Sequence, residues 1–77
     1  MEVRNRLREL RARHGLTQEA LAKAIGVSRQ TIIAMEKGRY NPSVQVALLL
    51  ARVLGEPVES IFWLEAPSSK EEGEGSL

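Results

Sequence analysis

A chain of 77 residues with a hydrophobic fraction of 43% suffices for one small domain but leaves little interior for an enclosed small-molecule site. Its 11 basic residues nearly balance 10 acidic ones, all glutamate, and the absence of cysteine excludes disulfides and cysteine-based zinc or redox sites. The longest apolar run, residues 46–51, is too short to span a membrane, so we expect a cytoplasmic protein without a membrane partner.

The charges are unevenly distributed along the chain. Residues 1–40 carry nine basic side chains against four glutamates, whereas residues 41–77 carry two against six. A basic half indicates a polyanionic partner such as nucleic acid. Ordinary arginines on solvated helix faces would give the same composition, so this observation leaves both interpretations open.

The first predicted helix covers residues 6–13. Leu7 and Leu10 fall on one face, Asn5 can cap the start, and the pair His14-Gly15 ends the helix. His14 is the single histidine, and at a helix end it is typical of a partner for the helix dipole, not of a catalytic base.

The second and third predicted helices begin with the same local pattern. Thr17 and Ser28 each supply a hydroxyl cap, and an apolar residue before each cap can pack on the fourth helical residue. Gly26 ends the second helix, and Gly38 follows the end of the third, which covers about residues 29–37. Two short helices joined by such a turn cross steeply, so the third should project from the surface.

The remaining chain completes the domain. A fourth helix is predicted to begin after Ser43 and end at residue 54 before Gly55, with apolar residues all around its axis, which predicts burial on most sides. A short fifth helical turn follows Pro57 through residue 61, and residues 62–64 favour a strand. The domain should therefore span residues 1–66, followed by a disordered acidic tail over residues 67–77.

The projecting third helix offers Arg29 and Gln30 in its first turn, while Ile32 and Met35 anchor it to the interior. Both exposed side chains have bidentate hydrogen-bonding ends, which suit base edges in the major groove of DNA. Two solvated polar residues at the start of a helix would look the same in isolation.

The run over residues 15–55 resembles the helix-turn-helix domain of phage repressor and Cro-type (Xre) regulators, and residues 3–65 are similar to the short single-domain members. The resemblance is carried by Thr17-Gln18, Ala22, Gly26, Ser28 with Thr31-Ile32, Glu36-x-Gly38 and Asn41-Pro42-Ser43. It implies an all-α, five-helix lambda-repressor-like fold with a small antiparallel pairing of residues 2–4 with residues 62–64.

The resemblance also implies a function. The chain would be a transcriptional regulator, most simply a repressor, that binds near-palindromic double-stranded DNA as a homodimer. Gln18 matches a phosphate contact, and for Ser28 the cap alone would explain the residue. Arg29 and Gln30 match base readers, although either could instead contact phosphate. The implied DNA-contacting residues are Gln18, Ser28, Arg29, Gln30, Thr31, Ala34, Lys37, Arg39, Tyr40 and Asn41.

Two positions of the third helix depart from a polar reading surface. Ala34 stands where relatives often carry a polar reader, and it can offer only an apolar contact such as one to a thymine methyl. Ile33 can make the same contact or pack sideways. Sequence preference at Ala34 should therefore be weak.

Two structural features also follow from the resemblance. Arg11 and Glu36 match a partly buried ion pair that sets the angle of the recognition helix, although Glu36 could instead pair within its own helix. A homodimer surface is expected where apolar residues exceed what a core of about 60 residues can hide; Trp63 could alternatively cover its own core. The expected interface residues are Leu49, Val53, Ile61, Phe62, Trp63 and Leu64.

Enzymatic and cofactor functions lack the necessary residues. No serine or threonine has a plausible base partner, the glutamates and His14 form no spaced metal-ligand cluster, and no phosphate-binding glycine loop is present. We therefore expect no enzyme, cofactor, metal or small-molecule ligand. The competing function is a protein-interaction module, such as an antitoxin or adaptor, whose binding would respond little to salt.

Overall fold

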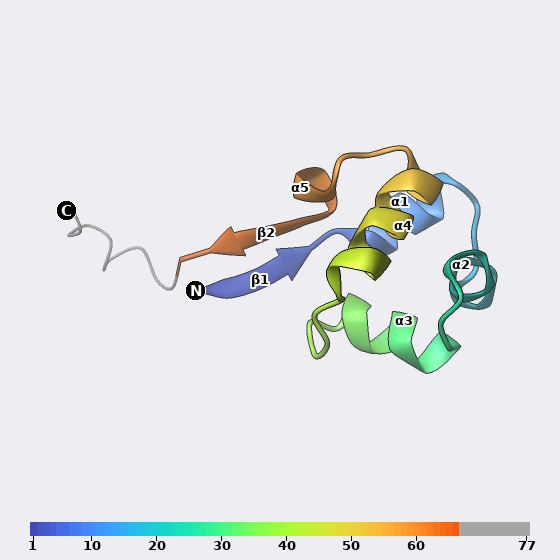
Figure 1. Cartoon of the computed structure of the whole chain (residues 1–77), viewed down its shortest axis with the longest axis horizontal. Helices are drawn as coiled ribbons and strands as arrows, with labels where there is room; N and C mark the ends of the chain where they lie inside the picture. Colours follow the sequence, from blue (N-terminus) through green and yellow to red (C-terminus); the bar gives the residue numbers. More distant parts are fainter. Residues whose placement is uncertain (67–77) are drawn as a thin grey trace.

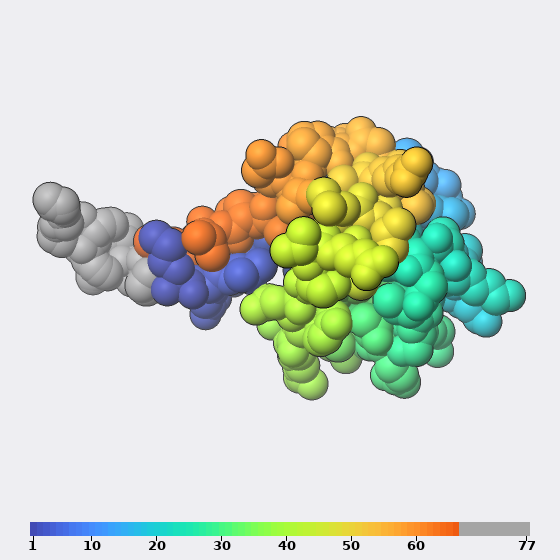
Figure 2. Space-filling model, viewed as in Figure 1, coloured from blue at the N-terminus to red at the C-terminus, as the bar shows by residue number. Residues whose placement is uncertain are grey.

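The computed structural model describes residues 1–66, and within them five helices and one antiparallel pair of strands follow the predicted order (Figure 1). The helices gather into a rounded bundle, and the two strands project from it as a narrow ribbon (Figure 2). The predicted acidic tail lies outside the described residues. The elements are β1 (Glu2–Asn5), α1 (Leu7–Arg13), α2 (Gln18–Ile25), α3 (Arg29–Glu36), α4 (Val44–Leu54), α5 (Val58–Ile61) and β2 (Phe62–Glu65).

Local signals in the sequence set most helix ends. Hydroxyl caps begin α2, α3 and α4, where Thr17, Ser28 and Ser43 accept hydrogen bonds from backbone N–H groups three residues ahead. Gly26 and Gly55 end α2 and α4 with φ values of 76° and 68°, a left-handed conformation that favours glycine. The predicted hydroxyl caps are confirmed, and α1 and α3 differ from their predicted bounds by one residue.

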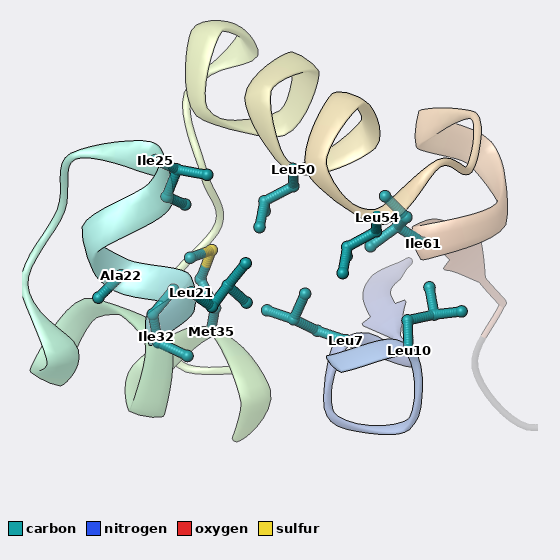
Figure 3. Packing of buried hydrophobic residues seen from close by; sticks show 10 residues of the cluster. All are labelled: Leu7, Leu10, Leu21, Ala22, Ile25, Ile32, Met35, Leu50, Leu54 and Ile61. Carbon is teal, nitrogen blue, oxygen red and sulfur yellow. The ribbon is translucent and has the colours of Figure 1, made fainter. Parts of the chain in front are cut away.

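Apolar side chains from all five helices form one core (Figure 3). Leu16 and Val27, the residues before the caps of α2 and α3, are partly buried and pack against it, as the sequence pattern predicts. The fully or nearly fully buried residues are Leu7, Leu10, Leu21, Ala22, Ile25, Ile32, Met35, Leu50, Leu54 and Ile61.

The prediction that α4 is buried on most sides is wrong. Leu50 and Leu54 are buried, but Val44 and Leu48 are 76% and 58% exposed. The described part of the chain packs α4 mainly against α2 and α5, so the face carrying Val44 and Leu48 has no covering element there. Apolar residues on all sides of α4 therefore do not mean that all sides of this helix are buried within the single chain.

The predicted pairing of the two chain segments is confirmed, and each strand is one residue longer than predicted, ending at Asn5 and at Glu65. β1 and β2 run antiparallel, with Val3 opposite Leu64 and Arg4 opposite Trp63. The backbone N–H of Arg6 donates to the carbonyl of Ile61 at 3.1 Å, and its guanidinium Nε donates to the carbonyl of Ser60 at 2.7 Å. These bonds hold the base of the ribbon against α5.

Asn5 joins the ribbon to two helices. Its Oδ1 accepts from the backbone N–H of Leu7 at 3.0 Å, and its Nδ2 donates to the carbonyl of Met35 at 2.9 Å. The first bond satisfies the first N–H group of α1, but the N-cap position is Arg6, which makes no side-chain cap, so Asn5 is not the N-cap that the sequence predicts. The second was not predicted, and it fixes the C-terminal end of α3 relative to the ribbon.

Replacing Asn5 with aspartate should lower the free energy of unfolding by about 1 to 2 kcal/mol. The carboxylate keeps the acceptor for Leu7 but loses the donor to Met35, and it places negative charge at the C-terminal end of α3. Urea denaturation followed by circular dichroism measures the loss. Asn41→Asp, in an exposed loop, is the matched control and should change stability by less than about 0.5 kcal/mol; equal effects would show that the Asn5 bonds are dispensable.

Candidate nucleic-acid interface

The start of α3 is presented to solvent by a buried anchor. Ile32 and Met35 are 0% exposed and hold the helix against α1 and α2, while Arg29 and Gln30 in its first turn are exposed. α2 and α3 follow each other across a short turn and pack together, in the order that the sequence predicts. The third helix can therefore enter a groove or cleft of a partner without unfolding its own core.

Three further residues of the same helix that the sequence analysis considered for DNA contact are less accessible. Thr31, Ile33 and Ala34 are half-buried. The hydroxyls of Ser28 and Thr31 lie 3.0 Å apart and hydrogen-bond to each other, and Ser28 also caps the helix. Both hydroxyls therefore have a structural role in the free protein.

Ion pairing divides the basic residues into two sets. Within residues 1–66, four arginines have a carboxylate partner: Arg4, Arg6, Arg11 and Arg13. The basic residues that form no ion pair in that part of the chain are Arg8, Lys23, Arg29, Lys37, Arg39 and Arg52. The basic side chains of α3 and the loop after it thus remain available to an external anion.

A nearly buried ion pair links α1 to the end of α3. Arg11 Nε donates to Glu36 Oε2 at 2.7 Å and its Nη2 donates to Oε1 at 3.4 Å, with side chains that are 15% and 7% exposed. Arg11 also donates to the carbonyl of Leu16 at 2.9 Å. The predicted pair is confirmed, and Glu36 makes it with α1 instead of with its own helix.

Gln18 belongs to the same network, which sequence reasoning missed. Its Nε2 donates to Glu36 Oε1 at 3.1 Å, and the side chain is partly buried at the start of α2. An amide nitrogen carries two hydrogens, so one remains for an external acceptor. Glu36 therefore orients the side chain that was predicted to contact phosphate.

The loop after α3 is exposed beside this network. Lys37, Arg39, Tyr40 and Asn41 all lie on the surface, and Tyr40 is 43% exposed. These residues directly follow the C-terminal end of α3 in the chain. Together with Gln18 at the start of α2, they border the helix that carries Arg29 and Gln30.

The predicted dimer residues do not form one exposed surface. Ile61 is 0% exposed and belongs to the monomer core, so its assignment to an interface is wrong. Leu49, Val53 and Phe62 are half-buried and pack against that core. Trp63 and Leu64, at 40% and 64% exposed on β2, are the two predicted interface residues that remain exposed.

Other classes of site find no support in the described part of the chain. No three His, Cys, Asp or Glu side chains within residues 1–66 lie close enough to hold a metal ion. None of the helices there has the length and apolar character needed to cross a membrane.

Known proteins share this arrangement. A helix-turn-helix family model (HTH_3) matches residues 7–61. An uncharacterized HTH-type transcriptional regulator from Methanocaldococcus jannaschii is 54% identical over 63 residues, covering 82% of this chain and 96% of that protein. The cryptic phage CTXphi transcriptional repressor RstR from Vibrio cholerae is 35% identical over 57 residues, covering 74% of this chain and 51% of the repressor.

A solved structure agrees with the sequence relatives. The restriction-modification controller protein C.AhdI from Aeromonas hydrophila matches with a TM-score of 0.64 and 39% sequence identity, covering 70% of this chain and 78% of that one. The matched family segment, residues 7–61, includes α1 to α5 and therefore the whole candidate interface.

Proposed function

The chain belongs to the HTH_3 helix-turn-helix family of DNA-binding transcriptional regulators, and from this premise we propose that it is a repressor that binds a near-palindromic operator as a homodimer. The family is one of regulators and not of enzymes. α3 enters the major groove and reads base edges with its first turn. The observation that carries the proposal is the exposure of Arg29 and Gln30 on a helix whose other face is fixed in the core.

The base-reading and backbone-binding residues are separate sets. Arg29 suits guanine and Gln30 suits adenine, because each side chain forms two parallel hydrogen bonds with that base. Gln18, Lys37 and Arg39 bind phosphates on either side of the groove, and these contacts supply affinity without sequence preference. Ser28, Thr31, Ala34, Tyr40 and Asn41 complete the contact surface.

A homodimer is supported by two arguments. One domain contacts too few base pairs for useful specificity, so a pair of domains on two half-sites is required. Trp63 and Leu64 also leave apolar surface exposed on β2, beside the half-buried Phe62. Pairing through α5 and β2 should hold the two α3 helices about 34 Å apart, one turn of B-DNA.

The experiment that tests the function is selection of binding sites from random duplex DNA. We expect enrichment of a sequence with two-fold symmetry and half-sites about one helical turn apart. Its affinity should fall steeply as salt rises, because phosphate contacts release counterions. No enrichment, together with binding that is insensitive to salt, would support a protein-interaction module instead.

The repressor assignment draws on the relative RstR, which is named a transcriptional repressor. A reporter promoter containing the selected site should lose transcription when the protein is present. Increased transcription from the same promoter would make the protein an activator.

Replacing Trp63 with alanine should weaken the dimer by about tenfold or more, because a partly exposed indole contributes a large apolar area when a partner covers it. Light scattering across a concentration series measures the dissociation. Leu48→Ala, which removes a similarly exposed apolar side chain from α4, is the control and should leave the dimer intact. If Leu48→Ala dissociates the dimer and Trp63→Ala does not, the interface lies on α4.

A further inference from the structure

A hollow of about 450 Å³ lies where α1, the start of α2 and α3 meet. It is distinct from the outer face of α3, because three elements contribute to its walls. The hollow therefore lies beside Gln18, one of the residues that we propose to bind phosphate. The lining residues are Arg8, Arg11, Thr17, Gln18, Ile33, Glu36 and Lys37.

The hollow has an excess of positive charge. Three cations, Arg8, Arg11 and Lys37, line it against the single carboxylate of Glu36. That carboxylate already accepts hydrogen bonds from Arg11 and Gln18, so it does not compete for the other two cations. Arg8 and Lys37 have no ion-pair partner within residues 1–66.

The other walls suit a sugar-phosphate segment. The first N–H groups of a helix lack intrahelical partners, and Thr17 and Gln18 at the start of α2 line the hollow. Gln18 has an amide hydrogen left over from its bond to Glu36. Ile33 adds an apolar surface, which fits the carbon atoms of a deoxyribose and not a strongly hydrated free ion.

We propose that Arg8 is a further DNA-contacting residue, which binds a backbone phosphate held in this hollow together with Lys37 and Gln18. The proposal rests on the proposed function, since it adds α1 to the surface that α2 and α3 present to DNA. Arg8 lies on the same short helix as Arg11 and Arg13, but both of these are held by carboxylates. Within residues 1–66, ion pairing thus leaves Arg8 as the arginine of α1 that has no carboxylate partner.

The test compares four variants of the full chain on the selected operator and on a scrambled duplex. Arg8→Ala should weaken both complexes alike and make the slope of log affinity against log salt shallower by about 0.9 for each bound protomer. Arg8→Lys should restore the slope, because the charge is retained. Arg52→Ala, which removes an unpaired arginine from α4 outside the hollow, should leave the slope unchanged and controls for net charge.

Lys37→Ala separates the failure of this proposal from failure of the proposed function. If Lys37→Ala reduces the slope and Arg8→Ala does not, α1 makes no phosphate contact and the proposal is overturned. If neither variant changes a slope that is steep in the unmodified protein, DNA binds elsewhere and both proposals fail. Equal reductions of the salt slope by Arg8→Ala and Arg52→Ala would also overturn the proposal for Arg8, because the change in net charge would then explain the effect. Circular dichroism checks that each variant is folded.

Discussion

Replacing Glu36 with glutamine should lower the free energy of unfolding by about 3 kcal/mol. The glutamine keeps the shape of the side chain but leaves the guanidinium of Arg11, which is 15% exposed, without its counter-ion. Removing one partner of a buried pair is costly, because the remaining charge is neither well solvated nor neutralised. Urea denaturation measures the loss without adding salt that would screen the pair.

The matched control for this variant is Glu9→Gln. Glu9 pairs with Arg13 at the same 2.7 Å distance, but both side chains are more than half exposed. A surface pair of this kind contributes about 0 to 1 kcal/mol to stability. Glu9→Gln should therefore cost much less stability than Glu36→Gln, because the two pairs differ in burial and not in distance. If both variants lose the same small amount, the Arg11–Glu36 pair does not hold α3 in place.

A double variant tests whether the loss comes from the stranded charge. Arg11→Met combined with Glu36→Leu removes both charges of the pair, and replacing a buried pair by apolar residues is often neutral. The double variant should therefore be more stable than Glu36→Gln alone. Its DNA affinity should nevertheless be reduced, because Gln18 then lacks the acceptor that orients it.

The fold was predictable because its signals are local. A hydroxyl cap, the apolar residue before it and the glycine after the helix lie within one or two turns of each other, as at Thr17, Leu16 and Gly26. Such short-range patterns depend little on the rest of the chain. The pairing of β1 with β2 and the Arg11–Glu36 pair instead came from the family resemblance, because residues so far apart carry no local signal.

The missed features all require knowledge of how the helices pack. The bonds from Gln18 to Glu36 and from Asn5 to Met35 join residues 18 and 30 positions apart. A half-buried amide has several acceptors within reach, and only the packed structure selects one. The sequence of α4 and α5 likewise does not reveal which apolar face is covered by another helix. Ile61 was therefore assigned to an interface although it is buried, and Leu48 was not although it is exposed.

Replacing Arg29 or Gln30 should remove sequence preference more than affinity. A bidentate contact to a base edge is worth about 1 to 3 kcal/mol of discrimination, or about 5- to 150-fold at each half-site. Arg29→Lys and Gln30→Ala are the informative changes. Lysine keeps the charge of Arg29 but loses its planar pair of donors, and alanine removes the amide of Gln30 without changing any charge.

The measurement is the ratio of affinities for the selected operator and a scrambled duplex at several salt concentrations. Both variants should lower this ratio while the salt slope stays unchanged, because no phosphate contact is lost. Lys37→Ala is the matched control from the end of the same helix, and it should weaken both duplexes alike and reduce the slope.

A lower affinity ratio with an unchanged salt slope indicates base reading, and an unchanged ratio with a shallower slope indicates backbone binding. A measurement of total affinity alone does not distinguish the two. If Arg29→Lys and Gln30→Ala both keep the full ratio, the first turn of α3 is not the reader. The specificity would then have to come from the loop residues Arg39 to Asn41 or from the sequence-dependent shape of the DNA, because Ile33 and Ala34 can offer only apolar contacts.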